Sequence, residues 1–227
     1  MEWVSPIIRR ATMTLLTASP QIPTIADLLE RLGGIAPDRV RFYPLPGTAT
    51  EADVIAIDAH EDRVCELIDG VLVEKPMGIR ESFVAVVIAS ILRQFVVPRN
   101  LGMVTGESGT MRILPGLVRI PDVAYTSVQR LPGGHVPDEP IPALVPDLAV
   151  EVLSKSNTQA EMARKLGEDF SAGVRLVWLV DLNTRSVSVY SDPARCVAFT
   201  IEQQLDGGDV LPGFTLPVRD IFAELDV

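Results

Sequence analysis

The chain has 227 residues, of which 47% are hydrophobic, and a formal net charge of −10 from 30 acidic and 20 basic side chains. This length and apolar content predict one large domain or two small ones with a buried core, and they exclude an intrinsically disordered chain. The acidic balance opposes general attraction to a polyanion, so any nucleic-acid function must depend on local basic patches or metal ions.

Cysteine and histidine give no sign of a zinc site or of a disulfide framework. Each type occurs twice, as Cys65 and Cys196 and as His60 and His135, and none of these residues has metal-binding spacing. So few cysteines are typical of a reduced compartment, and we expect a cytoplasmic location.

Neither the N-terminus nor the most apolar run has the pattern of a targeting or membrane segment. Residues 1–20 contain an arginine pair and a weakly apolar stretch that Thr and Ser interrupt, which predicts a poorly ordered leader rather than a signal peptide. The apolar run at 82–92 is too short to span a membrane and has charged flanks, so it predicts a core helix and no membrane association.

The first hundred residues predict helices around one hairpin. TIADLLERLGG carries a helical apolar stripe after a capping Thr24. The strongest hairpin signal is VCELIDGVLVEKP, in which Asp69-Gly70 joins two apolar runs. The predicted elements are a helix at 24–34, a short helix at 51–59, a hairpin at 64–76 and a helix at 80–97, which Pro98 ends.

Strands dominate the rest of the chain, with one further helix. Thr158 and Glu161 match the capping box that starts a helix, and Gly173 suits its end. The run VRLVWLVD is typical of a strand buried on both faces, whereas the alternating RSVSVYS suits an edge strand. The predicted elements are strands at 102–113, 117–126 and 147–153, a helix at 158–171, and strands at 174–181, 185–191 and 196–202. One α/β domain over residues 21–227 is the economical interpretation.

Two carboxylates lie at or inside apolar, strand-forming runs: Asp122 in RIPDVAY and Glu151 in PDLAVEVLS. Burying an unpaired carboxylate is costly, so these positions need a physical reason. On neighbouring strands the two can converge on one Mg²⁺ or Mn²⁺ ion, because magnesium is commonly held by one or two carboxylates together with substrate phosphate. Lys165, on the following helix, can orient or deprotonate a water and stabilise charge on the phosphate. The pattern favours metal-assisted phosphodiester hydrolysis.

The ordinary alternative is that both acids are strand-end residues, exposed or paired with arginine. Asp147 illustrates this alternative, because it shares the Pro-Asp dipeptide with Asp122 but opens its strand, and we interpret it as a loop or strand-start residue. Lys165 has a comparable alternative as a surface lysine paired with Glu161 or Asp169 at helical spacing.

The order of ELIDGVLVE, RIPDVAY, PDLAVEVLS, EMARKL, SAGVRLVWLVD and VLPGF resembles the Uma2 family of bacterial restriction-endonuclease-like proteins. That family belongs to the PD-(D/E)xK nuclease superfamily, and the resemblance extends from about residue 20 to the C-terminus. It implies an α/β fold with a restriction-endonuclease-like mixed β-sheet core flanked by helices. It also implies a divalent metal at the strand carboxylates. The helices and hairpin of the first hundred residues would then form an N-terminal extension to that core.

Carried over by position, Asp122 resembles the motif aspartate and Glu151 the second acidic ligand. Leu153 stands where the superfamily usually has its lysine, and the family's helix lysine matches Lys165 instead. Lys155, four residues after Glu151, is the rival, although its Ser- and Asn-rich surroundings predict a solvated loop.

Two further acids are candidates for the same site. Glu66 matches the glutamate of the family's ELIDG-type motif and is expected to complete the site or to bind metal through water. Glu81 stands near the start of the long helix, where we expect this family often to carry histidine, and the helix dipole alone favours an acid there. We therefore rank Glu66 above Glu81.

These observations predict a Mg²⁺- or Mn²⁺-dependent endonuclease acting on DNA, with Asp122 and Glu151 as metal ligands and Lys165 and Glu66 completing the catalytic set. A homodimer is expected, because the edge-type strand at 185–191 and the apolar VLPGFTLPVRDIF invite a partner subunit. The alternatives are a non-catalytic scaffold that retains the fold, which Leu153 and Glu81 would favour, and a hydrolase of small phosphoesters.

Overall fold

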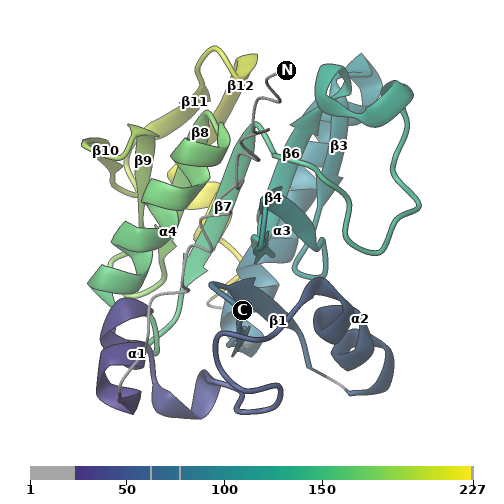
Figure 1. Cartoon of the computed structure of the whole chain (residues 1–227). Coiled ribbons are helices and arrows are strands. Elements are labelled where there is room, and N and C mark those ends of the chain that lie inside the picture. Colours follow the sequence, from purple (N-terminus) through teal and green to yellow (C-terminus); the bar gives the residue numbers. More distant parts are fainter. Residues whose placement is uncertain (1–23, 62, 77, 226–227) are drawn as a thin grey trace, which may run out of the picture.

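The architecture is built around a six-stranded mixed sheet (Figure 1). A computed structural model describes residues 24–61, 63–76 and 78–225, so the predicted leader at 1–20 lies outside the described residues. In this sheet β7 and β8 are parallel and the other neighbours are antiparallel. The strand order is β10 (Arg195–Phe199), β9 (Ser186–Asp192), β8 (Leu176–Asp181), β7 (Leu148–Leu153), β6 (Val123–Ser127) and β3 (Gly102–Thr105).

Helices cover both faces of this sheet, and the alternation of side chains along β7 shows which face each helix covers. Val150 and Val152 belong to the core that includes α3 (Ile79–Val96). Ala149 points the other way, into the cluster formed with α4 (Gln159–Ala172). Because successive strand residues face opposite sides, Glu151 shares the α4 side.

Among the described residues, one helical stretch, Ile79–Arg99, is long and apolar enough to cross a membrane by length and composition alone. Its side chains Val84, Ile88 and Leu92 are fully buried against the six-stranded sheet. One face of the predicted core helix is therefore packed in the core, while other apolar side chains of the helix, such as Val86 at 60%, are exposed.

The N-terminal part contributes a second, four-stranded sheet. Its order is β2 (Val71–Glu74), β1 (Cys65–Ile68), β5 (Leu117–Arg119) and β4 (Met111–Leu114). Asp69 and Gly70, with φ of 53° and 73°, form the predicted tight hairpin turn between β1 and β2. Figure 1 shows β1, α1 (Ile25–Arg31) and α2 (Glu51–His60) gathered at one end of the molecule. The described residues also form short 3₁₀ turns at Pro37–Arg39, Val97–Arg99, Val128–Arg130 and Pro132–Gly134.

Two long predicted strands are each divided between the two sheets. The expected strand at 102–113 is β3 and β4 with a turn between them, and the expected strand at 117–126 is β5 and β6. The second break includes Pro121, which has no N–H for a ladder hydrogen bond. It places Asp122 at the junction of the sheets, just before β6.

The prediction of an edge strand at 185–191 is wrong, because β9 pairs with both β8 and β10. The apolar C-terminal stretch is also internal: β11 (Gln204–Gly207), β12 (Leu211–Pro217) and α5 (Val218–Phe222) contribute Phe214 and Phe222 to the core beside α3. Alternating polarity reports one solvated face, and it does not distinguish an edge strand from an inner one. Neither the strand at 185–191 nor the apolar C-terminal stretch therefore supports a dimer.

Candidate active site

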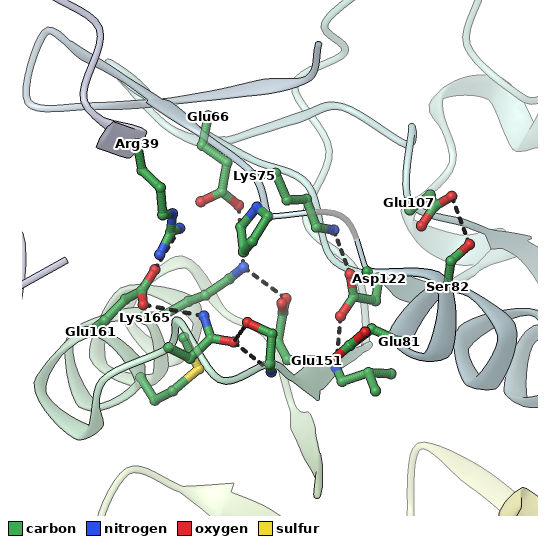
Figure 2. A pocket seen from close by; sticks show the side chains of 16 residues that line it. Arg39, Glu66, Lys75, Glu81, Ser82, Glu107, Asp122, Glu151, Glu161 and Lys165 are labelled. Atoms are coloured by element: carbon green, nitrogen blue, oxygen red, sulfur yellow. Dashed lines mark hydrogen bonds and ion pairs between the residues drawn. The ribbon is translucent and has the colours of Figure 1, made fainter. Parts of the chain in front are cut away.

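The predicted acids meet in a small pocket at the junction of the two sheets, beside the N-terminal part of α4 (Figure 2). The cavity volume is about 30 Å³, which is close to the share of one water molecule in the liquid. Its charged lining residues come from both sheets, α3, α4 and two loops: Arg39, Glu66, Lys75, Glu81, Glu107, Asp122, Glu151, Glu161 and Lys165.

Asp122 uses one carboxylate oxygen for the fold and presents the other to the pocket. Oδ2 accepts a hydrogen bond of 2.6 Å from the backbone N–H of Val152, which ties the start of β6 to the end of β7. Oδ1 lies 2.8 Å from the ammonium of Lys75. Asp122 is therefore held rigidly by Val152, and its second oxygen contacts the ammonium of Lys75 in the pocket.

Asp147 makes the equivalent tie at the opposite end of the same strand pair. Its Oδ2 accepts a hydrogen bond of 2.8 Å from the N–H of Ser127, and Arg130 Nε lies 3.1 Å from Oδ1. Asp147 is 2% exposed and does not line the pocket. Its position just before β7 agrees with its interpretation as a strand-start residue.

Glu151 is a buried carboxylate whose charge is poorly satisfied by protein groups. Lys165 Nζ lies 2.8 Å from its Oε1, but this oxygen receives no well-directed hydrogen bond from the described residues. Burial raises the pKa of Glu151 to about 7, and the charge of Asp122 adds to this effect while Lys165 opposes it. Both features show that Lys165 alone does not satisfy the buried charge of Glu151.

Lys165 reaches this pocket from α4, where it is only 6% exposed. Besides Glu151, its ammonium donates a hydrogen bond of 3.2 Å to Glu66 Oε1. Burial lowers the pKa of Lys165, but Glu151 and Glu66 more than offset this effect, so the net shift is upward. The alternative of a surface lysine paired with Glu161 is wrong, because Glu161 pairs with Arg39 at 2.8 Å.

Glu66 anchors the base of the pocket. Its Oε1 accepts hydrogen bonds from Lys165 and, at 3.0 Å, from the N–H of Ile120, and its Oε2 accepts one of 2.6 Å from Arg119. Burial raises the pKa of Glu66, but Lys165 and Arg119 outweigh it and hold that pKa well below its usual range. The geometry makes Glu66 the group that positions Lys165.

Two cationic residues of the pocket carried no assignment in the sequence. Lys75 follows β2 and pairs with Asp122, and Arg39 lies in a 3₁₀ turn and pairs with Glu161. The hairpin prediction included Lys75 but contained no signal that its end meets residue 122, because that proximity arises from pairing of β1 with β5.

Glu81 and Lys155 differ in their relation to the pocket. Glu81 lines it from the first turn of α3, where its carboxylate lies so close over Gly78 that a Cβ there would be 1.9 Å from Oε2. Lys155 is exposed in the loop between β7 and α4 and lines an adjacent groove with Arg80. Lys165, rather than Lys155, therefore contacts the candidate acids.

The pocket residues fit a divalent cation held by Asp122 and Glu151. Six carboxylates and three cationic side chains line the pocket, which leaves a formal excess of three negative charges. No group of three or more metal-binding side chains forms within the described ranges. Two carboxylates suit magnesium, which usually keeps several water ligands. The hydrogen-bond-deficient Oε1 of Glu151 is the atom that a cation would satisfy.

A family model described as "Uma2: Putative restriction endonuclease" matches residues 41–219 of the chain. Among solved structures, the chain is similar to a protein from Anabaena variabilis ATCC 29413 described as a putative nuclease belonging to DUF820. The two share 21% identity with a TM-score of 0.63, and the match covers 80% of this chain and 95% of the other.

This likeness confirms the predicted fold class, a mixed sheet flanked by helices as in nuclease-fold proteins. No protein of curated function matches the chain.

Proposed function

The chain belongs to the Uma2 family, and on that premise we propose that it is a divalent-metal-dependent endonuclease that hydrolyses phosphodiester bonds in DNA. The observation that carries the proposal is the convergence of Asp122, Glu151 and Lys165 in one buried pocket. A scaffold with decayed chemistry has no need of the buried Glu151 and the half-buried Asp122 in one cavity with an ion-paired lysine, because such an arrangement costs stability.

Asp122 and Glu151 would hold the Mg²⁺ or Mn²⁺ ion. When bound, this ion would polarise a phosphoryl oxygen and lower the pKa of a water molecule. Asp122 is preorganised for this role, because Val152 fixes its other oxygen. Glu151 is preorganised by its place on a central strand.

Lys165 would act as a charged hydrogen-bond donor rather than as a base. Its pKa is raised by Glu151 and Glu66, so its ammonium keeps its proton at neutral pH. A fixed positive charge in a buried site stabilises negative charge that develops on the phosphate and orients the attacking water. Glu66 sets the direction of this ammonium.

A nucleic-acid substrate, which we propose to be DNA, is supported by the cations that border the acidic pocket. One neighbouring groove, of about 370 Å³, is lined by Arg80 and Lys155 against one acid, Glu81, and another, of about 610 Å³, by Arg39, Arg63 and Lys75 against Asp38 and Glu74. A local excess of cations of this kind can bind backbone phosphates although the whole chain is acidic.

A homodimer also belongs to this proposal, now on functional grounds alone. Cleavage of both strands of a duplex is served by two sites related by a two-fold axis. A monomer mass by light scattering across a wide concentration range would exclude it.

The test of the function compares Asp122→Asn with Asp147→Asn. Both substitutions keep an oxygen that can accept the backbone hydrogen bond, but the first removes charge from the pocket and the second removes it from the far end of the strand pair. We expect Asp122→Asn to lose Mn²⁺ binding, measured by titration calorimetry, and cleavage of duplex DNA, whereas Asp147→Asn keeps both.

Asp147→Asn should instead lower the free energy of unfolding by about 1–3 kcal/mol, because it weakens hydrogen bonds to a buried charged group. If the native chain binds neither Mg²⁺ nor Mn²⁺, the scaffold alternative replaces the enzyme. Metal binding without DNA cleavage but with hydrolysis of a small phosphodiester would change the substrate class.

A further inference from the structure

Lys75 places a positive charge where a metal ion at Asp122 would lie. Its ammonium is 2.8 Å from Asp122 Oδ1 and donates a hydrogen bond of 2.5 Å to the carbonyl oxygen of Ile120. The side chain is only 8% exposed. A carboxylate and a backbone carbonyl are both oxygen ligands of the kind that hard divalent cations select. The ammonium and the metal would therefore use the same oxygen atom of Asp122.

The two lysines of the pocket differ in the room that surrounds them. Behind Lys165, the gap beside Leu166 and Asp169 has a cavity volume of about 0 Å³, and the ammonium is held by two carboxylates. Lys75 stands between the acidic pocket and an open groove of about 610 Å³, whose other charged lining residues are Asp38, Arg39, Arg63 and Glu74. Of the two, Lys75 can leave its carboxylate without disturbing the packing of a helix.

We propose that Lys75 is a tethered competitor of the divalent cation, which neutralises Asp122 until the metal binds and then moves its ammonium into the groove beside Arg63. The inference rests on the proposed function, because it takes Asp122 and Glu151 as the metal ligands. In the groove the displaced ammonium adds positive charge where a substrate phosphate would lie. Metal binding and substrate binding would then favour each other, because a coupling free energy acts in both directions.

The test measures metal affinity rather than activity. Mn²⁺ is titrated calorimetrically into the native full chain, Lys75→Met and Lys155→Met. Both variants remove one positive charge, but Lys155 is exposed in a loop and makes no contact with Asp122. We expect Lys75→Met to bind Mn²⁺ about tenfold more tightly or better, because a charge in direct contact shifts ionic equilibria by about 1–3 pK units. Lys155→Met should change the affinity by less than about twofold at physiological salt, where solvent screens a distant charge.

A second measurement covers the case in which Lys75→Met is unstable, since it leaves Asp122 without its ion pair. Saturating Mn²⁺ should raise the melting temperature of Lys75→Met more than that of the native chain, because tighter binding stabilises the folded state more. A Lys75→Met chain that stays unfolded at saturating Mn²⁺ overturns the inference, because the bound ion should replace the missing ammonium.

The outcomes separate the inference from the function on which it rests. Equal or weaker Mn²⁺ affinity in Lys75→Met overturns the competition and makes Lys75 a positioning residue for Asp122, while the metal site stands. Absence of Mn²⁺ binding in the native chain and in Lys75→Met overturns both the competition and the proposed metal dependence.

Discussion

At the scale of single residues, the two Pro-Asp aspartates show how one structural device serves two purposes. Asp122 and Asp147 each use Oδ2 to accept the backbone N–H at the end of the neighbouring strand. The second oxygen of Asp147 contacts Arg130, which neutralises the charge of the carboxylate. Asp122 meets Lys75, which has an open groove behind it. The difference between a structural and a functional carboxylate lies in what its second oxygen contacts.

Replacing Lys165 and replacing Lys155 should affect different steps of the reaction. Lys165→Met removes an ammonium fixed between Glu66 and Glu151, and we expect the cleavage rate to fall about 10²–10⁴-fold, the usual effect of losing a positioned proton-transfer or charge-stabilising group. Lys155→Met should weaken substrate binding and reduce the slope of affinity against salt by about one phosphate contact.

Single-turnover kinetics and a salt series on duplex DNA distinguish the two variants. Because Lys165→Met leaves buried acids less compensated, its folding must be checked by urea unfolding before its kinetics are interpreted. Full activity of Lys165→Met with an inactive Lys155→Met would move the catalytic role to the loop.

At the scale of elements, α4 connects the four-stranded sheet to the six-stranded one through ion pairs. Glu161 binds Arg39, Arg164 binds Asp69, and Glu168 binds Arg119, whose other branch binds Glu66. The capping box of Thr158 and Glu161 and the left-handed Gly173, with φ of 102°, fix where this helix begins and ends. These restraints position Lys165 so that its ammonium contacts Glu151.

This connection predicts unequal contributions from two arginines of the same network. Arg119 is 3% exposed, and Arg119→Met would remove one cationic partner from Glu66, which keeps Lys165, and one from Glu168, which keeps Arg164, so we expect a loss of up to about 3–5 kcal/mol in the free energy of unfolding. Arg31 binds the half-exposed Asp69, and Arg31→Met should cost no more than about 1 kcal/mol. Urea unfolding measures the loss of unfolding free energy in both variants. If the two losses are similar and small, α4 is held by apolar packing alone.

At the scale of the whole molecule, burial of charge makes stability depend on pH. Asp169 is 2% exposed, and its Oδ2 has no hydrogen-bond partner within the described part of the chain. Burial raises its pKa from 3.8 to about 6, although Lys165 and Arg119 oppose the shift. The folded state therefore prefers the protonated form, and the stability that Asp169 contributes below pH 3.8 is lost as the pH rises through 6.

The variant Asp169→Asn should lack this loss. The difference in unfolding free energy between Asp169→Asn and the native chain should grow between about pH 4 and pH 6 and level off above, by about 3 kcal/mol in total. Urea unfolding at several pH values measures this change, which does not depend on the constant cost of burying the amide. A difference that stays flat across this interval would mean that Asp169 is ionised in the fold at low pH.

The sequence determined the local structure and the acidic pair of this protein. The hairpin turn, the helix boundaries and the helix caps depend on residues that are neighbours in the sequence. Asp69-Gly70 and the Thr158 capping box are examples. Asp122 and Glu151 could be singled out because carboxylates in apolar strands are chemically unusual, and Lys165 because it matches the helix lysine of the Uma2 family. Tertiary structure alone decided how the strands are shared between two sheets, that β9 is an inner strand, and that Lys75 and Arg39 enter the pocket. These features arise from pairings between distant segments, such as β1 with β5, and local sequence carries no record of which partner a strand will find.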